Sequence, residues 1–214
     1  MLSRDGGYKA IRLLVSRSRL LGVSLIEVLV SIVIASIALL ALAGVNASSI
    51  RYTKMSQYRA TAARLAGDIG ERMRANKGQA AVAAAVGPPV VVGVAATGFF
   101  AGDYDYTADD FSEQATKAVL PGTLCNTAAS NCTPAQIAAL DLAQWRILVR
   151  DQLPEGSVFI SRQAGQVAAD VWVVWRDPAV ASTDEAPALA NECPNALSTG
   201  GDLSVRCSFF RINL

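Results

Sequence analysis

The sequence predicts an α+β protein in which a long N-terminal helix packs on a head that contains an antiparallel β-sheet. Residues 28–50 carry no charge, and residues 51–76 continue with apolar side chains at intervals of three and four, the period of a helix. Toward the C-terminus, short stretches alternate apolar and polar residues, as half-buried strands do. Helices followed by successive strands are typical of an α+β head with an antiparallel meander.

The composition excludes several classes of function. The 214 residues include 19 Lys and Arg, 18 Asp and Glu, and no histidine. A nearly neutral chain lacks the basic excess of a chain-wide nucleic-acid surface. Without histidine, His-based triads and His-containing zinc sites cannot form. No phosphate-binding loop or dinucleotide fingerprint occurs either. We therefore expect no enzymatic activity, no cofactor and no metal site.

Charge is distributed unevenly, and its distribution predicts the domain organisation. Residues 1–22 have a net charge of +4, residues 50–77 of +5, and residues 78–214 of −7. The mean hydropathy of +0.32 is high for a soluble domain. Four segments are expected: a leader at 1–22, a transmembrane or assembly helix at 23–50, an amphipathic stem helix at 51–76, and a globular head at 77–214.

The apolar stretch from Val28 to Ile50 is long enough to cross a membrane. Its 23 residues would form a helix of about 35 Å, against a hydrocarbon core of about 30 Å. A buried core helix is rarely free of charge over such a length, and a cleaved secretory signal has a shorter apolar region of about 7–15 residues. We therefore expect a retained anchor. Basic residues on both sides leave its orientation open.

Glu27 breaks the apolar pattern at its start. A charged side chain costs about 2.5–3.5 kcal/mol at the centre of a bilayer and less near the interface. One interpretation is a carboxylate that reaches the interface, and the other is a carboxylate with a cationic partner inside an assembly. Because no Lys or Arg occurs in the next 23 residues, such a partner would come from another chain or from an amine created by cleavage.

The segment from Gly22 to Leu29, which reads Gly-Val-Ser-Leu-Ile-Glu-Val-Leu after a short basic leader, resembles the class III signal of type IV pilins and type II secretion pseudopilins. The resemblance implies that a prepilin peptidase cuts after Gly22 on the cytoplasmic side and methylates the new N-terminus at Val23. It also implies that Glu27 is retained for subunit assembly. Val23 stands where phenylalanine is usual in the family.

The resemblance also gives Glu27 a physical role. A new α-amine at Val23 would be a cation beside the bilayer, and in a filament of packed helices the Glu27 carboxylate of one subunit can meet the amine of its neighbour. Attraction and desolvation are both large in such a low-dielectric setting. We therefore expect the pair to set the register of the subunits more than to add stability.

Apolar residues at intervals of three and four mark one face of the stem helix. Basic residues fill much of the other face, which we interpret as a solvated or subunit-contacting surface rather than a nucleic-acid site. The helix is expected to end near Asn76, with Gly78 as its stop. The apolar face comprises Met55, Tyr58, Ala62, Leu65, Ile69 and Met73.

The region after the stem predicts irregular structure. The Gly-Pro-Pro sequence at 87–89 stops a helix, and residues 90–94 are a candidate strand. The acidic and aromatic residues at 104–106 and 109–110 are interpreted as a solvated loop. Calcium binding is the alternative, although the spacing does not match an EF-hand loop.

Four cysteines, at positions 125, 132, 193 and 207, follow the anchor. Their spacing is not that of a zinc or thioredoxin-like site, so an even count predicts two disulfides in an oxidising compartment. Three connectivities are possible. Cys125–Cys132 with Cys193–Cys207 closes the shortest loops and is the preferred pairing.

The head contains one clear helix signal and three strand signals. Thr133 begins a capping box followed by proline, which predicts a helix over about 134–150. Apolar alternation predicts strands at 157–162, 167–176 and 204–213. The tryptophans are assigned to the core or to a subunit interface.

More narrowly, the chain resembles PilV-type minor pilins. The features are Arg-Met-Arg-Ala-Asn at residues 72–76, the Cys125 and Cys132 pair before a Trp-containing helix, and the Leu-Pro-x-Gly turn at 153–156. The resemblance implies a low-abundance subunit that primes type IV pilus assembly, with other minor and major pilins and a large tip adhesin as partners. It places the chain in the inner membrane as a single-pass protein with a periplasmic head, and then in the extracellular pilus, which serves adhesion and motility.

Other classes of function are weighed against this one. A type II secretion pseudopilin shares the features up to about residue 76. A membrane-anchored periplasmic binding protein or enzyme is a further alternative, although an enzyme would need a catalytic constellation that the sequence lacks. A DNA-receptor pilin would need a basic head, whereas residues 78–214 are acidic, so no nucleic-acid partner is expected.

Overall fold

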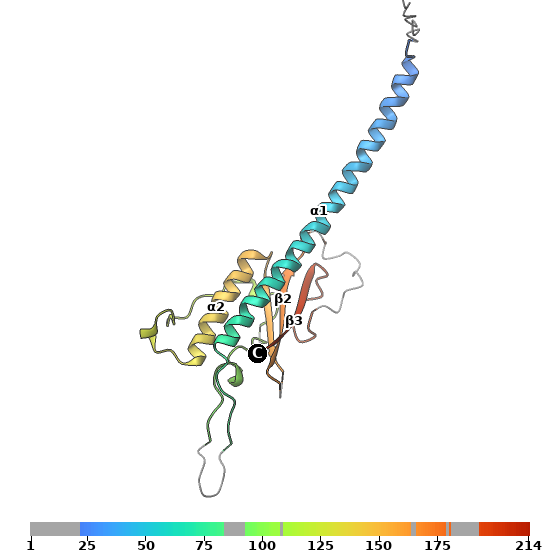
Figure 1. Ribbon diagram of the computed structural model, residues 1–214. Coiled ribbons are helices and arrows are strands. Elements are labelled where there is room, and N and C mark those ends of the chain that lie inside the picture. The colour runs from blue at the N-terminus through green and yellow to red at the C-terminus, as the bar shows by residue number, and fades with distance from the viewer. Residues whose placement is uncertain (1–21, 84–92, 108, 164–165, 179, 181–192) are drawn as a thin grey trace, which may run out of the picture. The chain divides into compact units, whose positions relative to one another are not determined.

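The computed structural model describes residues 22–83, 93–107, 109–163, 166–178, 180 and 193–214 (Figure 1). The chain divides into two compact units, Met1–Ser48 and Ser49–Leu214. Residues 1–21 of the predicted leader lie outside the described residues. The elements are helix α1 (Leu25–Ala75), short 3₁₀ turns at Gly98–Ala101, Glu113–Ala115 and Ala128–Ser130, helix α2 (Pro134–Gln152), and strands β1 (Ser157–Arg162), β2 (Ala168–Arg176) and β3 (Val205–Asn213).

The three strands form an antiparallel sheet in the order β1-β2-β3. The register places Phe159 opposite Trp172 and Trp172 opposite Phe209, so these aromatic side chains share one face of the sheet. A long N-terminal helix packs on this sheet, which confirms the expected α+β fold. The predicted strands are also confirmed, with β2 and β3 each starting one residue later than expected.

Within the head, α1 packs through a narrow apolar stripe. Ala62, Leu65, Ile69 and Met73 are buried, as their spacing predicted, whereas Tyr58 is only partly buried against the core. Gly70 allows a close approach to the sheet, because a Cβ there would lie 3.2 Å from Cγ2 of Ile212 on β3.

Helix α1 ends at Ala75, close to the predicted position. Gly78 follows with φ of +70°, and a Cβ at this position would lie 2.1 Å from the Thr97 carbonyl oxygen. Only glycine combines this backbone conformation with such close contact. The candidate strand at 90–94 lies mostly outside the described residues, and Val94 itself forms an isolated antiparallel bridge with Val82.

Both faces of the sheet are covered. On one face, Val171, Val173 and Trp175 of β2 pack in the main core with α1 and α2. On the other face, Phe159 and Val174 pack with residues from the loops before α2 and before β3. The second cluster comprises Phe111, Phe159, Val174, Leu197, Val205 and Cys207.

Helix α2 lies beside the head portion of α1 (Figure 1). It begins with the predicted capping box: the Thr133 side chain accepts from the Gln136 backbone N–H, and the Gln136 side chain accepts from the Thr133 backbone N–H. Trp145 is fully buried, and its Nε1 donates to the Leu65 carbonyl oxygen of α1 at 2.8 Å. This bond links the two helices at the centre of the core and satisfies the only polar group of the indole.

The turn between α2 and β1 leaves no space for a side chain at Gly156. Glu155 adopts a positive φ of 49°, and a Cβ on Gly156 would lie 2.2 Å from the Val149 carbonyl oxygen. Because the obstructing atom belongs to the backbone of α2, the clash cannot be relieved by a rotamer change.

We therefore predict that Gly156→Ala lowers the free energy of unfolding by about 1–3 kcal/mol, the usual cost of overpacking. Gly122→Ala is the control, because a Cβ added at Gly122 would have no atom within 4 Å. Chemical unfolding of the detergent-solubilised full chain, followed by tryptophan fluorescence, measures both. Equal stability of the two variants would contradict the argument.

Candidate assembly and processing site

The predicted processing residues lie at the start of α1. Gly22, Val23 and Ser24 precede the helix, and the side chain of Val23 is exposed. Ser24 provides the first backbone acceptor, since its carbonyl oxygen accepts from the Glu27 and Val28 N–H groups at 3.0 and 3.3 Å. The peptide bond between Gly22 and Val23 is therefore outside regular structure, which is the form in which a peptidase can bind a substrate chain.

Glu27 lies in the first turn of α1. A carboxylate there is favoured by the partial positive charge at a helix N-terminus. Its side chain is exposed and forms no ion pair with any described residue. The described part of the chain thus supplies no cation that pairs with this carboxylate.

The first half of α1 exposes apolar side chains on all sides. Leu25 is 91% exposed, and the residues from 25 to 50 are exposed without exception. By length and composition this helix can cross a membrane, and none of its apolar window is buried within the described structure. The hydroxyls of Ser31 and Ser36 donate to the carbonyl oxygens of Glu27 and Ile32, each at 2.7 Å. These bonds remove the polar cost of placing serine in lipid or against another helix.

In the head, the cysteines are joined as Cys125–Cys132 and Cys193–Cys207, with Cα–Cα distances of 5.9 and 5.0 Å. This is the connectivity with the shortest loops. The first bridge closes the segment before α2, and the second attaches the segment before β3 to the strand itself. In a chain-entropy account, each bridge stabilises the fold by about 2–4 kcal/mol.

The interpretation of residues 104–106 and 109–110 as a solvated loop was wrong for Tyr104. Tyr104 is 1% exposed and belongs to the main core, and Tyr106 packs against that core. The Arg146 guanidinium lies over the Tyr106 ring, 4.1 Å from its centroid. Burial within the core, rather than ion binding, accounts for the aromatic residues. The described residues contain no cluster of three acidic or sulfur side chains arranged for a metal.

A buried polar network joins the end of α1 to α2 through Tyr104. The Tyr104 hydroxyl donates to Asp141 Oδ2 at 2.7 Å and accepts from Asn76 Nδ2 at 3.2 Å. Arg72 Nη1 donates to Asp141 Oδ1 at 3.1 Å, and Asn76 also donates to the Pro134 carbonyl oxygen at 2.7 Å. The sequence analysis assigned Arg72 no role beyond the resemblance, and Asn76 only the expected end of the stem helix. The network itself was not predicted, because its members are up to 69 positions apart.

The network predicts a dependence of stability on alkaline pH. Burial, and then the hydrogen bond to Asp141, raise the pKa of Tyr104 well above its usual range. Below pH 10 the Tyr104 phenol is protonated in both the folded and the unfolded state, so its contribution to the free energy of unfolding does not change with pH. As the pH rises above about 10, the unfolded state loses the proton first, so stability falls by up to about 1.4 kcal/mol per pH unit.

We predict that Tyr104→Phe reduces this alkaline loss of stability, while costing about 1–3 kcal/mol at neutral pH because Asn76 and Asp141 lose a buried partner. Tyr52→Phe is the control, since the Tyr52 side chain is 73% exposed. Urea unfolding of the solubilised full chain at several pH values between 8 and 12 measures the slopes. An unchanged slope in Tyr104→Phe would contradict the assignment.

Comparison with known proteins gives one match, and it falls on the N-terminal segment that contains Gly22, Val23 and Glu27. Residues 17–43 match the family model of the prokaryotic N-terminal methylation motif. The chain carries a prepilin-type methylation motif. No curated protein and no solved structure matches the chain. The motif covers the exposed start of α1 and supports a type IV pilin-like or pseudopilin-like protein.

The motif has general consequences for processing and location. It implies processing by a prepilin peptidase and pilin-like partners. Together with the unburied apolar helix, it indicates membrane anchoring through that helix. Proteins that carry the motif are typically structural rather than catalytic.

Proposed function

We propose that this protein is a minor pilin that takes part in the assembly and priming of type IV pili, within a complex of minor pilins at the filament tip. The observation that carries the proposal is the coincidence of three features on one segment. The methylation motif, the unburied apolar helix and the carboxylate of Glu27 in its first turn all lie within residues 17–50.

The proposed pathway begins in the inner membrane. The peptidase cuts between Gly22 and Val23, and the new amine at Val23 is methylated. Residues 23–50 form the transmembrane and later the assembly helix, residues 51–76 the stem, and residues 77–214 a periplasmic head. Two disulfides suit a head that folds in an oxidising compartment.

In the filament, Glu27 of one subunit pairs with the N-terminal amine of another. The apolar surface from Leu25 to Ile50 exchanges lipid for the helices of neighbouring subunits, so little hydrophobic burial is gained or lost. The charge pair then distinguishes the correct register from the others, because a mismatched register leaves both charges buried without a partner.

The finer proposal is a PilV-type subunit with other minor and major pilins and a large tip adhesin as partners. It rests on residues 72–76, the Cys125–Cys132 bridge before α2 and the turn at 153–156. A type II secretion pseudopilin is the second candidate, because it shares the N-terminal motif. A membrane-anchored periplasmic binding protein is the third, and it predicts that the chain never leaves the membrane.

The first test is the mass and N-terminal sequence of the protein extracted from membranes, with and without the prepilin peptidase. We predict a chain that begins at Val23 and carries one methyl group when the peptidase is present, and an uncut chain when it is absent. Cleavage beyond residue 45, or an identical product in both strains, would contradict processing at Gly22.

The second test is Glu27→Ala. We predict that the variant is processed and stays in the membrane, while its amount in sheared pili falls by more than tenfold, because removing one partner of a buried ion pair costs about 3–5 kcal/mol. Glu71→Ala is the control: it removes the same charge from the same helix, at an exposed carboxylate paired with Arg74. Normal incorporation of the Glu27 variant would rule out the assembly role.

A further inference from the structure

The two outer strands of the sheet differ in how their outward backbone groups are satisfied. On β1, each backbone N–H that points away from β2 donates a hydrogen bond to a residue outside the three-stranded sheet. Such closure prevents another chain from pairing with the edge. The closing contacts are the double hydrogen bond between Tyr106 and Ile160 at 2.8 and 2.9 Å, the two bonds of the Gln114 side chain to Val158 at 2.8 and 2.9 Å, and the bond from the Arg162 N–H to Asp105 Oδ1 at 2.8 Å.

These contacts determine which backbone groups of β3 face outward. Ile160 directs its N–H and C=O away from β2, and it lies opposite Val171, which in turn lies opposite Phe210. Antiparallel ladders alternate, so Val171 and Phe210 are bonded to each other. The outward groups of β3 therefore belong to the odd-numbered residues, with Phe209 at the centre.

The outward groups at the two ends of β3 are satisfied, and those in the middle are not. At one end, the Val205 N–H donates to the Asp202 carbonyl oxygen at 3.2 Å. At the other, Arg74 of α1 donates to the Asn213 carbonyl oxygen at 3.0 Å. The three positions between them, Cys207, Phe209 and Arg211, have no outward backbone hydrogen bond to any described residue. With respect to the described part of the chain, the open edge thus covers three successive outward positions.

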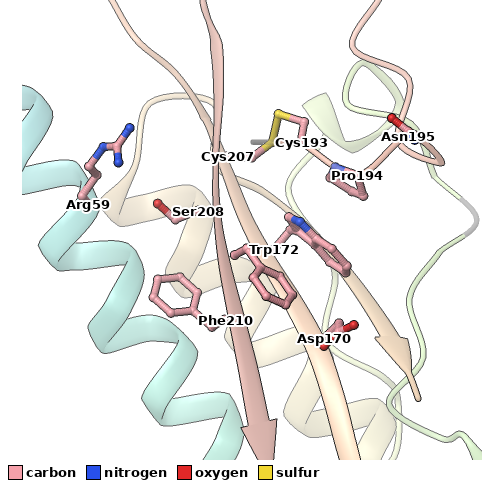
Figure 2. Close-up of a pocket in the computed structure, with 10 residues that line it drawn as sticks. Arg59, Asp170, Trp172, Cys193, Pro194, Asn195, Cys207, Ser208 and Phe210 are labelled. Atoms are coloured by element: carbon pink, nitrogen blue, oxygen red, sulfur yellow. A yellow bond between two sulfur atoms is a disulfide. The ribbon is translucent and has the colours of Figure 1, made fainter. Parts of the chain in front are cut away.

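A hollow of about 860 Å³ lies along this open edge and reaches both faces of β3 (Figure 2). On one face it is lined by Trp172 and Phe209, whose ring centroids are 4.9 Å apart, and by residues 193–195, which the Cys193–Cys207 bridge ties to β3. On the other it is lined by Ser208 and Phe210 of β3 and by Arg59 of α1. A space on both faces of an open edge is what an additional strand requires, because its side chains point alternately to either face.

The side chains beside this edge indicate which type of residue on an added strand would fit opposite Phe209. Phe209 is 48% exposed although it contacts Trp172, so the aromatic pair presents apolar surface to the hollow. The neighbouring Asp170 is 5% exposed, and both of its carboxylate oxygens accept from Arg211, at 2.7 and 2.9 Å. Because this charge is already paired, the hollow favours an apolar rather than a cationic side chain at that position.

We propose that an extended segment of another pilus subunit adds to β3 as a fourth strand, with an apolar side chain on the Trp172 and Phe209 pair. The proposal rests on the proposed pilin function for the nature of the partner. Backbone hydrogen bonds provide affinity in this mode of recognition, and the alternate side chains provide specificity. A second copy of this chain fits less well as the partner. Antiparallel pairing of β3 with β3 would set the stem portions of the two α1 helices, residues 51–75, in opposite directions, whereas the subunits of one filament share a direction.

The test is amide hydrogen exchange resolved to single residues of β3. Membranes from cells that express the full pilus machinery are compared with membranes from a host that expresses this chain alone. We expect the amides of Cys207, Phe209 and Arg211 to exchange roughly tenfold or more slowly in the first sample. The amides of Ser208 and Phe210, which face β2, should be protected equally in both.

Two variants separate the backbone contribution from that of the side chain. Phe209→Pro removes an outward N–H and leaves every β2–β3 hydrogen bond in place, which an edge strand tolerates. Phe209→Ala removes the ring but retains the N–H. We expect the proline variant to abolish the partner-dependent protection at 207 and 211 and the alanine variant to retain part of it. Formation of the Cys193–Cys207 bridge and protection at Ser208 report that each variant is folded.

The outcomes are distinct. Protection of the outward amides in the chain expressed alone, as a monomer by sedimentation in detergent, would show that the chain covers its own edge and would overturn the proposal. The same protection in a dimer would assign the edge to a second copy and would also overturn it. Fast exchange in both membranes would show that no strand is added. Sheared pili are analysed separately, so absence of the chain from filaments would count against the proposed function without affecting the exchange result.

Discussion

The unburied apolar surface of residues 25–50 is the constraint from which the behaviour of this protein follows. Every residue of α1 from 25 to 50 is exposed, and most of them are apolar. Because water is a poor solvent for such a surface, it must lie in lipid or against other helices. Glu27 stands at its beginning, in the helical turn where a carboxylate is best tolerated. The passage from membrane to filament that we propose needs little change at this surface, because both environments offer the same apolar contact.

In the head, the second half of α1 is held by specific buried contacts. Trp145 bonds to the backbone of α1 in the middle of the contact, and Tyr104 joins α1 to α2 near the end of the helix. Gly70 removes the side chain that would separate α1 from β3. The second half of α1 is therefore held to the rest of the head by buried contacts.

The sheet is protected on one edge and open on the other. Gln114, Asp105 and Tyr106 satisfy the outward N–H groups of β1 without adding a full strand. In contrast, three outward positions of β3, beside an aromatic pair, have no backbone hydrogen bond to a described residue. Natural sheets usually cover or charge an exposed edge to prevent aggregation. The contrast between the two edges, as the described residues show it, is the basis of the strand addition proposed above.

Local patterns in the sequence determined the elements and the N-terminal motif. Charge-free length, apolar periodicity and the capping box at Thr133 are encoded by neighbouring residues, so the helices and strands were predicted to within a few positions. Only the tertiary structure decided the position of Tyr104, which local composition had assigned to a solvated loop, and its bond to Asp141, 37 positions away. The difference between β1 and β3 was likewise decided by the fold, because whether a backbone N–H is satisfied depends on which distant residue lies beside it. Spacing within a segment reports its period, whereas burial and edge exposure arise only when segments pack together.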